Sequence, residues 1–128
     1  MRTEKDVEAY LLRLRRRFQP VGDSAGTYLL ETTSELPAIA VRVNAPLVVL
    51  RVDVVEVTTR DPLPLFKRLL ELNSKSLVFA SYGLDGTKIA LQSALELENL
   101  DFNELQATLD EFELALAQQS PQLRELAK

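Results

Sequence analysis

Apolar residues recur at helical spacing along the first part of the chain, residues 3–18. One face of the predicted helix is apolar and comprises Val7, Tyr10, Leu11, Leu14 and Phe18. Thr3 can cap this helix, and Asp6 occupies the acidic position of a capping box. Gln19-Pro20 predicts where the helix ends, because a residue before proline is driven out of the helical region. A loop is expected next, at residues 22–26.

Alternation with period two replaces the helical period after this loop and predicts three strands. They cover residues 27–32, 38–44 and 47–58. Asn44-Ala45-Pro46 is a turn signal that joins the second strand to the third. Within the third strand the apolar positions change parity, which predicts a β-bulge near residues 53–55.

A helix is predicted at residues 63–72, with Asp61 as its N-cap, Pro62 at its first position and Asn73 as its C-cap. This helix is apolar on two sides. One row comprises Leu63, Phe66 and Leu70, and the other comprises Leu65, Leu69 and Leu72. Both sides must be covered, either within one subunit or by a second copy across a two-fold axis. We favour a homodimer and place Leu65, Leu69 and Leu72 at its contact.

Two further strands are predicted at residues 76–83 and 87–97, around the turn signal Asp85-Gly86. The last helix begins at the N-cap Asp101, and its buried stripe comprises Leu105, Leu109, Phe112 and Leu116. Pro121 interrupts this helix, and a short helical turn can follow. The order α-β-β-β-α-β-β-α predicts an α+β fold in one domain, residues 1–128, with helices packed on an antiparallel sheet.

The chain has neither cysteine nor histidine, and their absence excludes several function classes. Disulfides, thiolate metal sites and triads of the Ser-His-Asp or Cys-His type are impossible without them. A hydrolase built on carboxylates alone has two candidate pairs, Glu96 with Glu98 and Asp110 with Glu111. Their pattern is more typical of solvated side chains. We therefore expect no enzymatic activity, no metal and no cofactor.

The net charge of −4 and the pI of about 4.9 argue against general affinity for nucleic acid. Positive charge gathers in the first predicted helix, where arginines occupy positions 13 and 15–17. This run fits a solvated face that can pair with the acidic last helix; steering of an acidic partner or contact with nucleic acid is the alternative. No apolar run has the length of a signal peptide or of a membrane span, so we expect a cytoplasmic protein without membrane contact.

Three local patterns, together with the element order, the chain length and the acidic pI, carry a family resemblance. The patterns are Leu69-Leu70-Glu71-Leu72-Asn73, Gly83-Leu84-Asp85-Gly86 and Leu97-Glu98-Asn99-Leu100-Asp101. The chain resembles the YbjN domain family and its structural relatives, the type III secretion chaperones of the class that includes the Tir chaperone. The resemblance covers residues 61–119 by motif and the N-terminal half by element order. It implies a homodimer whose interface uses the middle helix and an adjoining strand, and clients bound as extended segments across apolar patches on the first helix and the sheet.

We therefore hypothesise a dimeric, chaperone-like or adaptor protein that holds a segment of a partner protein without turnover. Its client surface is expected on the first helix and the first strand, at Tyr10, Leu14, Phe18, Tyr28 and Leu30. The alternative is a regulatory domain with a small molecule bound between helix and sheet. An enclosed apolar pocket with a few convergent polar groups would favour that alternative, and an open apolar groove would favour a peptide client.

Overall fold

The computed structural model describes residues 2–23, 26–32 and 35–128, so Ser24 and Ala25 of the expected loop lie outside the described residues. The described residues form one antiparallel sheet of six strands in the order β1-β2-β3-β4-β6-β5. The strands are β1 (Phe18–Pro20), β2 (Thr27–Leu30), β3 (Ile39–Asn44), β4 (Leu47–Glu56), β5 (Ser81–Asp85) and β6 (Lys88–Glu96). The helices are α1 (Glu4–Arg13), α2 (Leu63–Lys75), α3 (Phe102–Gln118) and α4 (Ser120–Leu126).

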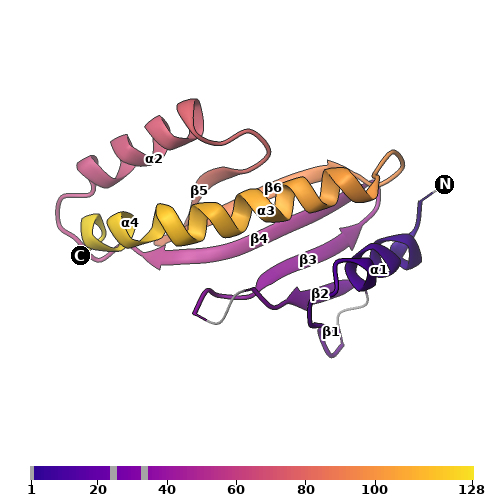
Figure 1. The fold of residues 1–128 in the computed structure, drawn as a ribbon. Coiled ribbons are helices and arrows are strands. Elements are labelled where there is room, and N and C mark those ends of the chain that lie inside the picture. Colours follow the sequence, from indigo (N-terminus) through magenta and orange to yellow (C-terminus); the bar gives the residue numbers. More distant parts are fainter. Residues whose placement is uncertain (1, 24–25, 33–34) are drawn as a thin grey trace.

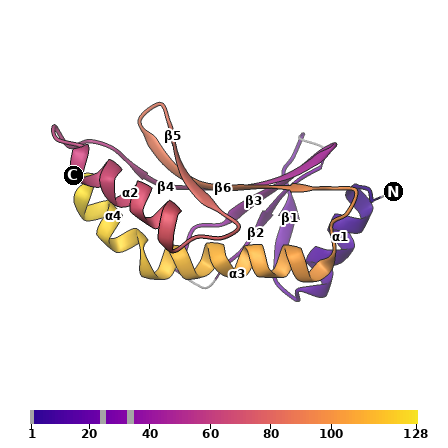
Figure 2. The same cartoon turned by 90° about the horizontal axis from the view of Figure 1, so that it is seen from above.

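The helices gather on one face of the sheet. Helix α3 runs along the sheet, and α1 lies at the end of the molecule that holds the N-terminus (Figure 1). Helices α2 and α4 lie at the opposite end, near the C-terminus (Figure 2). Burial alternates along β6, where Leu91 and Leu95 are buried while Gln92 and Ala94 are exposed. The core therefore lies between one face of the sheet and the helices, and the other face of the sheet meets solvent.

The α+β fold and the predicted element order are confirmed, with two short elements added. The first predicted helix is wrong in its last turns, because α1 ends at Arg13. Arg15 has a φ of 59°, a left-handed conformation that stops a helix and turns the chain back. The residues that follow form the added strand β1, which places Phe18 opposite Leu30 of β2. The second addition is α4, which begins at Ser120 and has Pro121 in its first turn.

The irregularity predicted in the long strand is confirmed. Asp53 of β4 is paired with Ala90 and Val55 with Ile89, so Val54 is the extra residue of a bulge. The predicted strand at residues 76–83 is wrong at its start, since α2 continues to Lys75 and β5 begins only at Ser81. The turn between β5 and β6 lies at residues 86–87.

The start and the buried stripe of the last helix are both confirmed. The Asp101 carboxylate accepts a hydrogen bond of 2.7 Å from the Glu104 N–H, as expected of an N-cap. At the start of α1 the Asp6 carboxylate accepts a hydrogen bond of 2.7 Å from the Thr3 N–H. All four predicted stripe residues are at most 1% exposed: Leu105, Leu109, Phe112 and Leu116. Helix α3 therefore fixes the centre of the core.

Candidate functional site

The residues predicted to form a client surface lie largely inside the protein. Tyr28 and Leu30 are 4% and 0% exposed, so these two belong to the core and offer no surface. Tyr10, Leu14 and Phe18 are half-buried and pack on that core. The physical reason is that the apolar side of β2 lies beneath α1. A partner that binds at the α1 end of the protein must therefore contact the exposed residues of α1 and β1.

The Tyr28 hydroxyl ties β2 to α1. It lies 3.0 Å from Glu4 Oε1 and 3.2 Å from Glu8 Oε2, and it can donate its proton to only one of them at a time. Burial, followed by these two carboxylates, raises the pKa of the Tyr28 phenol well above its ordinary value. This contact holds the first turns of α1 on the sheet, where they form one wall of a cleft.

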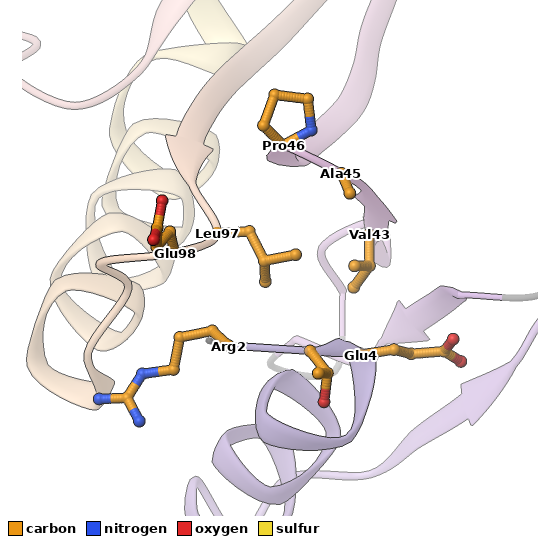
Figure 3. A pocket seen from close by; sticks show the side chains of 8 residues that line it. Arg2, Glu4, Val43, Ala45, Pro46, Leu97 and Glu98 are labelled. Atoms are coloured by element: carbon orange, nitrogen blue, oxygen red, sulfur yellow. The ribbon is translucent and has the colours of Figure 1, made fainter.

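That cleft has a volume of about 660 Å³ and lies between the start of α1, the β3–β4 turn and the loop from β6 to α3. We call it the α1 cleft. Its apolar lining comes from Val43, Ala45, Pro46 and Leu97 (Figure 3). The charged ends of Arg2 and Glu4 are turned away from its centre, and the Arg2 guanidinium donates to the Leu100 carbonyl at 3.0 Å.

The α1 cleft is open to solvent and lies at the end of the sheet, not between helix and sheet. A small polar ligand needs several polar groups that point at it. The four apolar residues of this lining instead suit apolar side chains that enter from a chain lying across the surface. The shape and chemistry of this cleft therefore fit a peptide better than an enclosed small molecule.

A second apolar surface lies on α2. Its inner row, Leu65, Leu69 and Leu72, is at most 7% exposed and is covered by the protein's own core. The three residues predicted to form the dimer contact are therefore unavailable for it without unfolding. The outer row comprises Leu63, Phe66 and Leu70, of which Leu63 is 73% and Leu70 is 69% exposed. Any contact made by the surface of α2 would use this outer row.

The loop from α2 to β5 adds Val78, 81% exposed, and Phe79, 44% exposed, to the apolar surface. The Glu111 carboxylate of α3 holds this loop by accepting backbone N–H groups from three successive residues. The distances are 3.0 Å to Val78 N, 2.9 Å to Phe79 N and 2.8 Å to Ala80 N. The two apolar side chains are thus presented by a loop of fixed shape.

The sequence matches the model of one protein family, CesT_Tir_1, over its whole length, residues 1–128. The chain belongs to the CesT_Tir_1 family. A search of curated proteins finds no match to the sequence.

Solved structures support this assignment by their fold. A chain of the heterodimeric ExoU–SpcU complex from the type III secretion system of Pseudomonas aeruginosa is 20% identical, with a TM-score of 0.74 and coverage of 93% of this chain and 98% of that one. YbjN, a putative transcription regulator from E. coli, is 12% identical, with a TM-score of 0.63 over 91% and 92% of the two chains. The Yersinia pestis type III secretion chaperone SycH, in complex with a stable fragment of YscM2, is 13% identical, with a TM-score of 0.64 and coverage of 89% of this chain and 96% of that one. The resemblance to YbjN and to type III secretion chaperones is confirmed.

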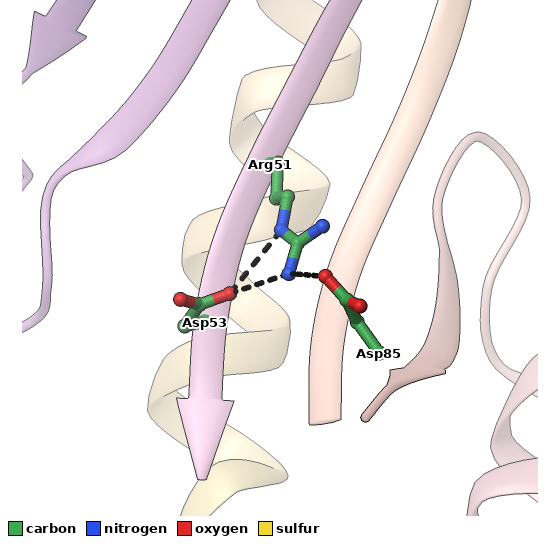
Figure 4. Close-up of polar contacts among 3 residues, drawn as sticks. All are labelled: Arg51, Asp53 and Asp85. Carbon is green, nitrogen blue, oxygen red and sulfur yellow. Dashed lines mark hydrogen bonds and ion pairs between the residues drawn. The ribbon is translucent and has the colours of Figure 1, made fainter. Parts of the chain in front are cut away.

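This CesT_Tir_1 member carries an ion-pair network of three side chains on the open face of the sheet. Arg51 of β4 donates from Nη2 to Asp53 at 3.0 Å and to Asp85 of β5 at 2.9 Å (Figure 4). The hydrogen bond to Asp85, followed by that to Asp53, raises the pKa of Arg51. All three side chains are at least 36% exposed, so each pair contributes only roughly 0.2–1 kcal/mol.

Two kinds of feature are absent from the described part of the chain. Its acidic residues form no group of three or more that could hold a metal ion. None of its helices is both long enough and apolar enough to span a membrane.

The apolar character of the outer row of α2 is visible in the sequence, but periodicity alone does not tell which row the core covers and which row is left for a dimer contact. Glu111 appeared only as one of a carboxylate pair, and its contact with residues 78–80 has no signal in the sequence. Asn73 was predicted to end α2, but it lies inside that helix and binds Tyr82 of β5.

Proposed function

We propose that this protein is a chaperone-like binding module that holds an extended segment of a partner protein without catalytic turnover. The observation that carries the proposal is the α1 cleft, an open recess with an apolar lining from which the charged ends of Arg2 and Glu4 are turned away. Family membership adds support, because structural relatives include the HopA1–SchA chaperone–effector complex, 14% identical over 95% of this chain and 92% of that one with a TM-score of 0.65. A cytoplasmic location is part of the proposal.

The β1 edge of the sheet supplies a place where the backbone of such a segment can bind. Glu31 N donates to Arg17 O at 2.9 Å, and Val21 N donates to Thr27 O at 2.8 Å. Arg17 and Val21 therefore direct their backbone groups towards β2. Because hydrogen bonds alternate along an antiparallel pair, Phe18, the residue after Arg17, directs its N–H and C=O away from β2. An extended segment can pair with these groups while its apolar side chains reach the surface beside α1.

The protein works as a homodimer in this proposal, and the contact is the outer row of α2. Leu63 and Leu70 are large, apolar and mostly exposed, and Val78 and Phe79 extend the apolar surface on the loop that follows this helix. An isologous contact buries such a surface against its own copy, which removes the cost of leaving it in water. The dimer leaves the α1 end of each subunit free for a partner.

Affinity purification from the native cell tests the binding function. A partner is expected to co-purify with the wild type and to be lost with Ala45→Arg, which fills the α1 cleft with a charged side chain. Ala94→Arg places the same side chain on the open face of the sheet and should retain the partner. A partner that stays bound to Ala45→Arg, or no partner above background with the wild type, would contradict the proposal.

Light scattering at micromolar concentration tests the dimer. The wild type should have twice the subunit mass, and Leu63→Glu/Leu70→Glu should be a folded monomer, as judged by circular dichroism. Leu114→Glu changes an exposed leucine of α3 and serves as the control, which should remain dimeric. A monomeric wild type would exclude the dimer.

A further inference from the structure

The two edges of the sheet differ in what they offer to an incoming strand. At the β5 edge, Asn73 occupies the N–H and C=O of Tyr82, and Glu111 occupies the N–H of Ala80. At the β1 edge, the outward groups of Phe18 have no such side-chain partner within the described residues. The β1 edge is short, since Pro20 has no N–H to donate. Side chains therefore block the start of β5, whereas the outward groups of Phe18 are open to a short extended segment at β1.

Four arginines, at positions 13 and 15–17, lead into this strand along the chain, and two of them are already engaged. Arg13 lies 4.1 Å from the centre of the Phe102 ring, and Arg16 pairs with Glu113 and, at 3.7 Å, with Asp110. This pairing of the basic run with the acidic last helix agrees with the interpretation made from the sequence. This pairing neutralises only part of the positive charge of the arginine run.

The other two arginines, Arg15 and Arg17, are exposed and have no ion pair within the described part of the chain. Arg17 precedes Phe18 directly. Arg15 is three residues away, so its Cα lies within about 11 Å of that of Phe18. Arg17 therefore lies directly beside a chain that pairs with β1, and the backbone of Arg15 lies near it.

A recess of about 380 Å³ adjoins the same edge. Its lining includes Leu12, which is 63% exposed, together with Phe18 and the side chains of Arg16 and Arg17. Glu31 is the one acidic residue among the six that line it. The recess thus offers an apolar surface with cationic groups beside it.

We propose that the segment held at the β1 edge is acidic: it places an apolar side chain against Leu12 and Phe18, and its carboxylates pair with Arg15 and Arg17. This inference rests on the proposed function and names the chemistry of its partner. An acidic peptide fits better than nucleic acid, because the protein carries a net charge of −4 and the site combines strand-pairing groups with an apolar recess.

Selection of short random peptides on the immobilised full-length protein tests the inference. The proteins compared are the wild type, Arg15→Gln/Arg17→Gln and the control Arg124→Gln, which removes an exposed arginine of α4 at the other end of the molecule. Peptides selected on the wild type and the control should be enriched in Asp and Glu next to an apolar residue. Their affinity for the double variant should be about 3- to 30-fold weaker, and the difference should shrink at high salt.

Selected peptides without acidic enrichment, or with enrichment that survives in the double variant, would overturn this inference and leave the proposed function standing. Failure to select any peptide on the wild type would count against both. A single-stranded oligonucleotide that binds the wild type and not the double variant would overturn the assignment to an acidic peptide.

Discussion

The side-chain amide of Asn73 on α2 binds both backbone groups of Tyr82 on β5. Its Oδ1 accepts from the Tyr82 N–H at 2.7 Å, and its Nδ2 donates to the Tyr82 carbonyl at 3.1 Å. A single side chain thus takes the place of a neighbouring strand at the edge of the sheet. Exposed strand edges pair readily with other chains, so this contact closes a surface that would otherwise invite aggregation.

Replacing Asn73 by Ala should therefore destabilise the protein and open this edge. Loss of both hydrogen bonds at a partly buried site should cost about 1–3 kcal/mol of unfolding free energy, measured by urea denaturation. The Tyr82 amide should also exchange its hydrogen faster. Ser74→Ala, at an exposed neighbouring position, should change neither quantity. Unchanged exchange at Tyr82 in Asn73→Ala would argue against the closing role of this side chain.

Glu111→Ala should release the loop from α2 to β5. The carboxylate satisfies three successive backbone N–H groups, and its removal should cost about 1–3 kcal/mol and speed amide exchange at residues 78–80. Gln106→Ala is an exposed change on the same helix and should leave this exchange as it is. If the dimer uses Val78 and Phe79, the Glu111→Ala protein should also dissociate more readily in light scattering.

The two rows of α2 should respond differently to truncation. Leu65 is 0% exposed, so Leu65→Ala should lose about 2–5 kcal/mol of unfolding free energy through the cavity it leaves. Leu63 is 73% exposed, so Leu63→Ala should cost the isolated subunit less than about 0.5 kcal/mol. Urea denaturation at concentrations where both variants are monomeric makes the comparison. Equal losses would show that the two rows are not inner and outer as described.

Alkaline pH should destabilise the protein through Tyr82. Burial raises the pKa of Tyr82 to about 12, above the ordinary phenol value of 10.0. A raised folded-state pKa means that this stability is fully present below about pH 10 and is lost as the pH rises towards 12. Urea denaturation over this range should therefore show a decline that is shallower in Tyr82→Phe.

A second variant separates the causes of this pKa shift. The Tyr82 hydroxyl lies 2.6 Å from the Gln119 side-chain oxygen, and Gln119→Ala removes that partner while keeping the buried phenol. Because burial is the cause of the raised pKa, Gln119→Ala should retain most of the alkaline decline. A decline that disappears in Gln119→Ala would assign the effect to the hydrogen bond instead.

Most of the local structure follows from short-range patterns in the amino-acid sequence. The buried stripe of α3 and its cap at Asp101 follow from helical spacing and from a side chain that binds its own backbone nearby. The bulge next to Val55 follows from a change of parity, which reports directly which face of a strand is buried. These signals are legible because each depends on residues only a few positions apart.

Which surfaces are free depends on tertiary packing. The two apolar rows of α2 look alike in sequence, and packing against the core alone makes Leu65 an inner residue and Leu63 an outer one. Strand β1 is too short to show a period and exists because β2 offers it a partner. Asn73 binds a residue nine positions away, and Glu111 binds residues more than thirty positions away. Such contacts depend on how distant segments pack together, which no local pattern records.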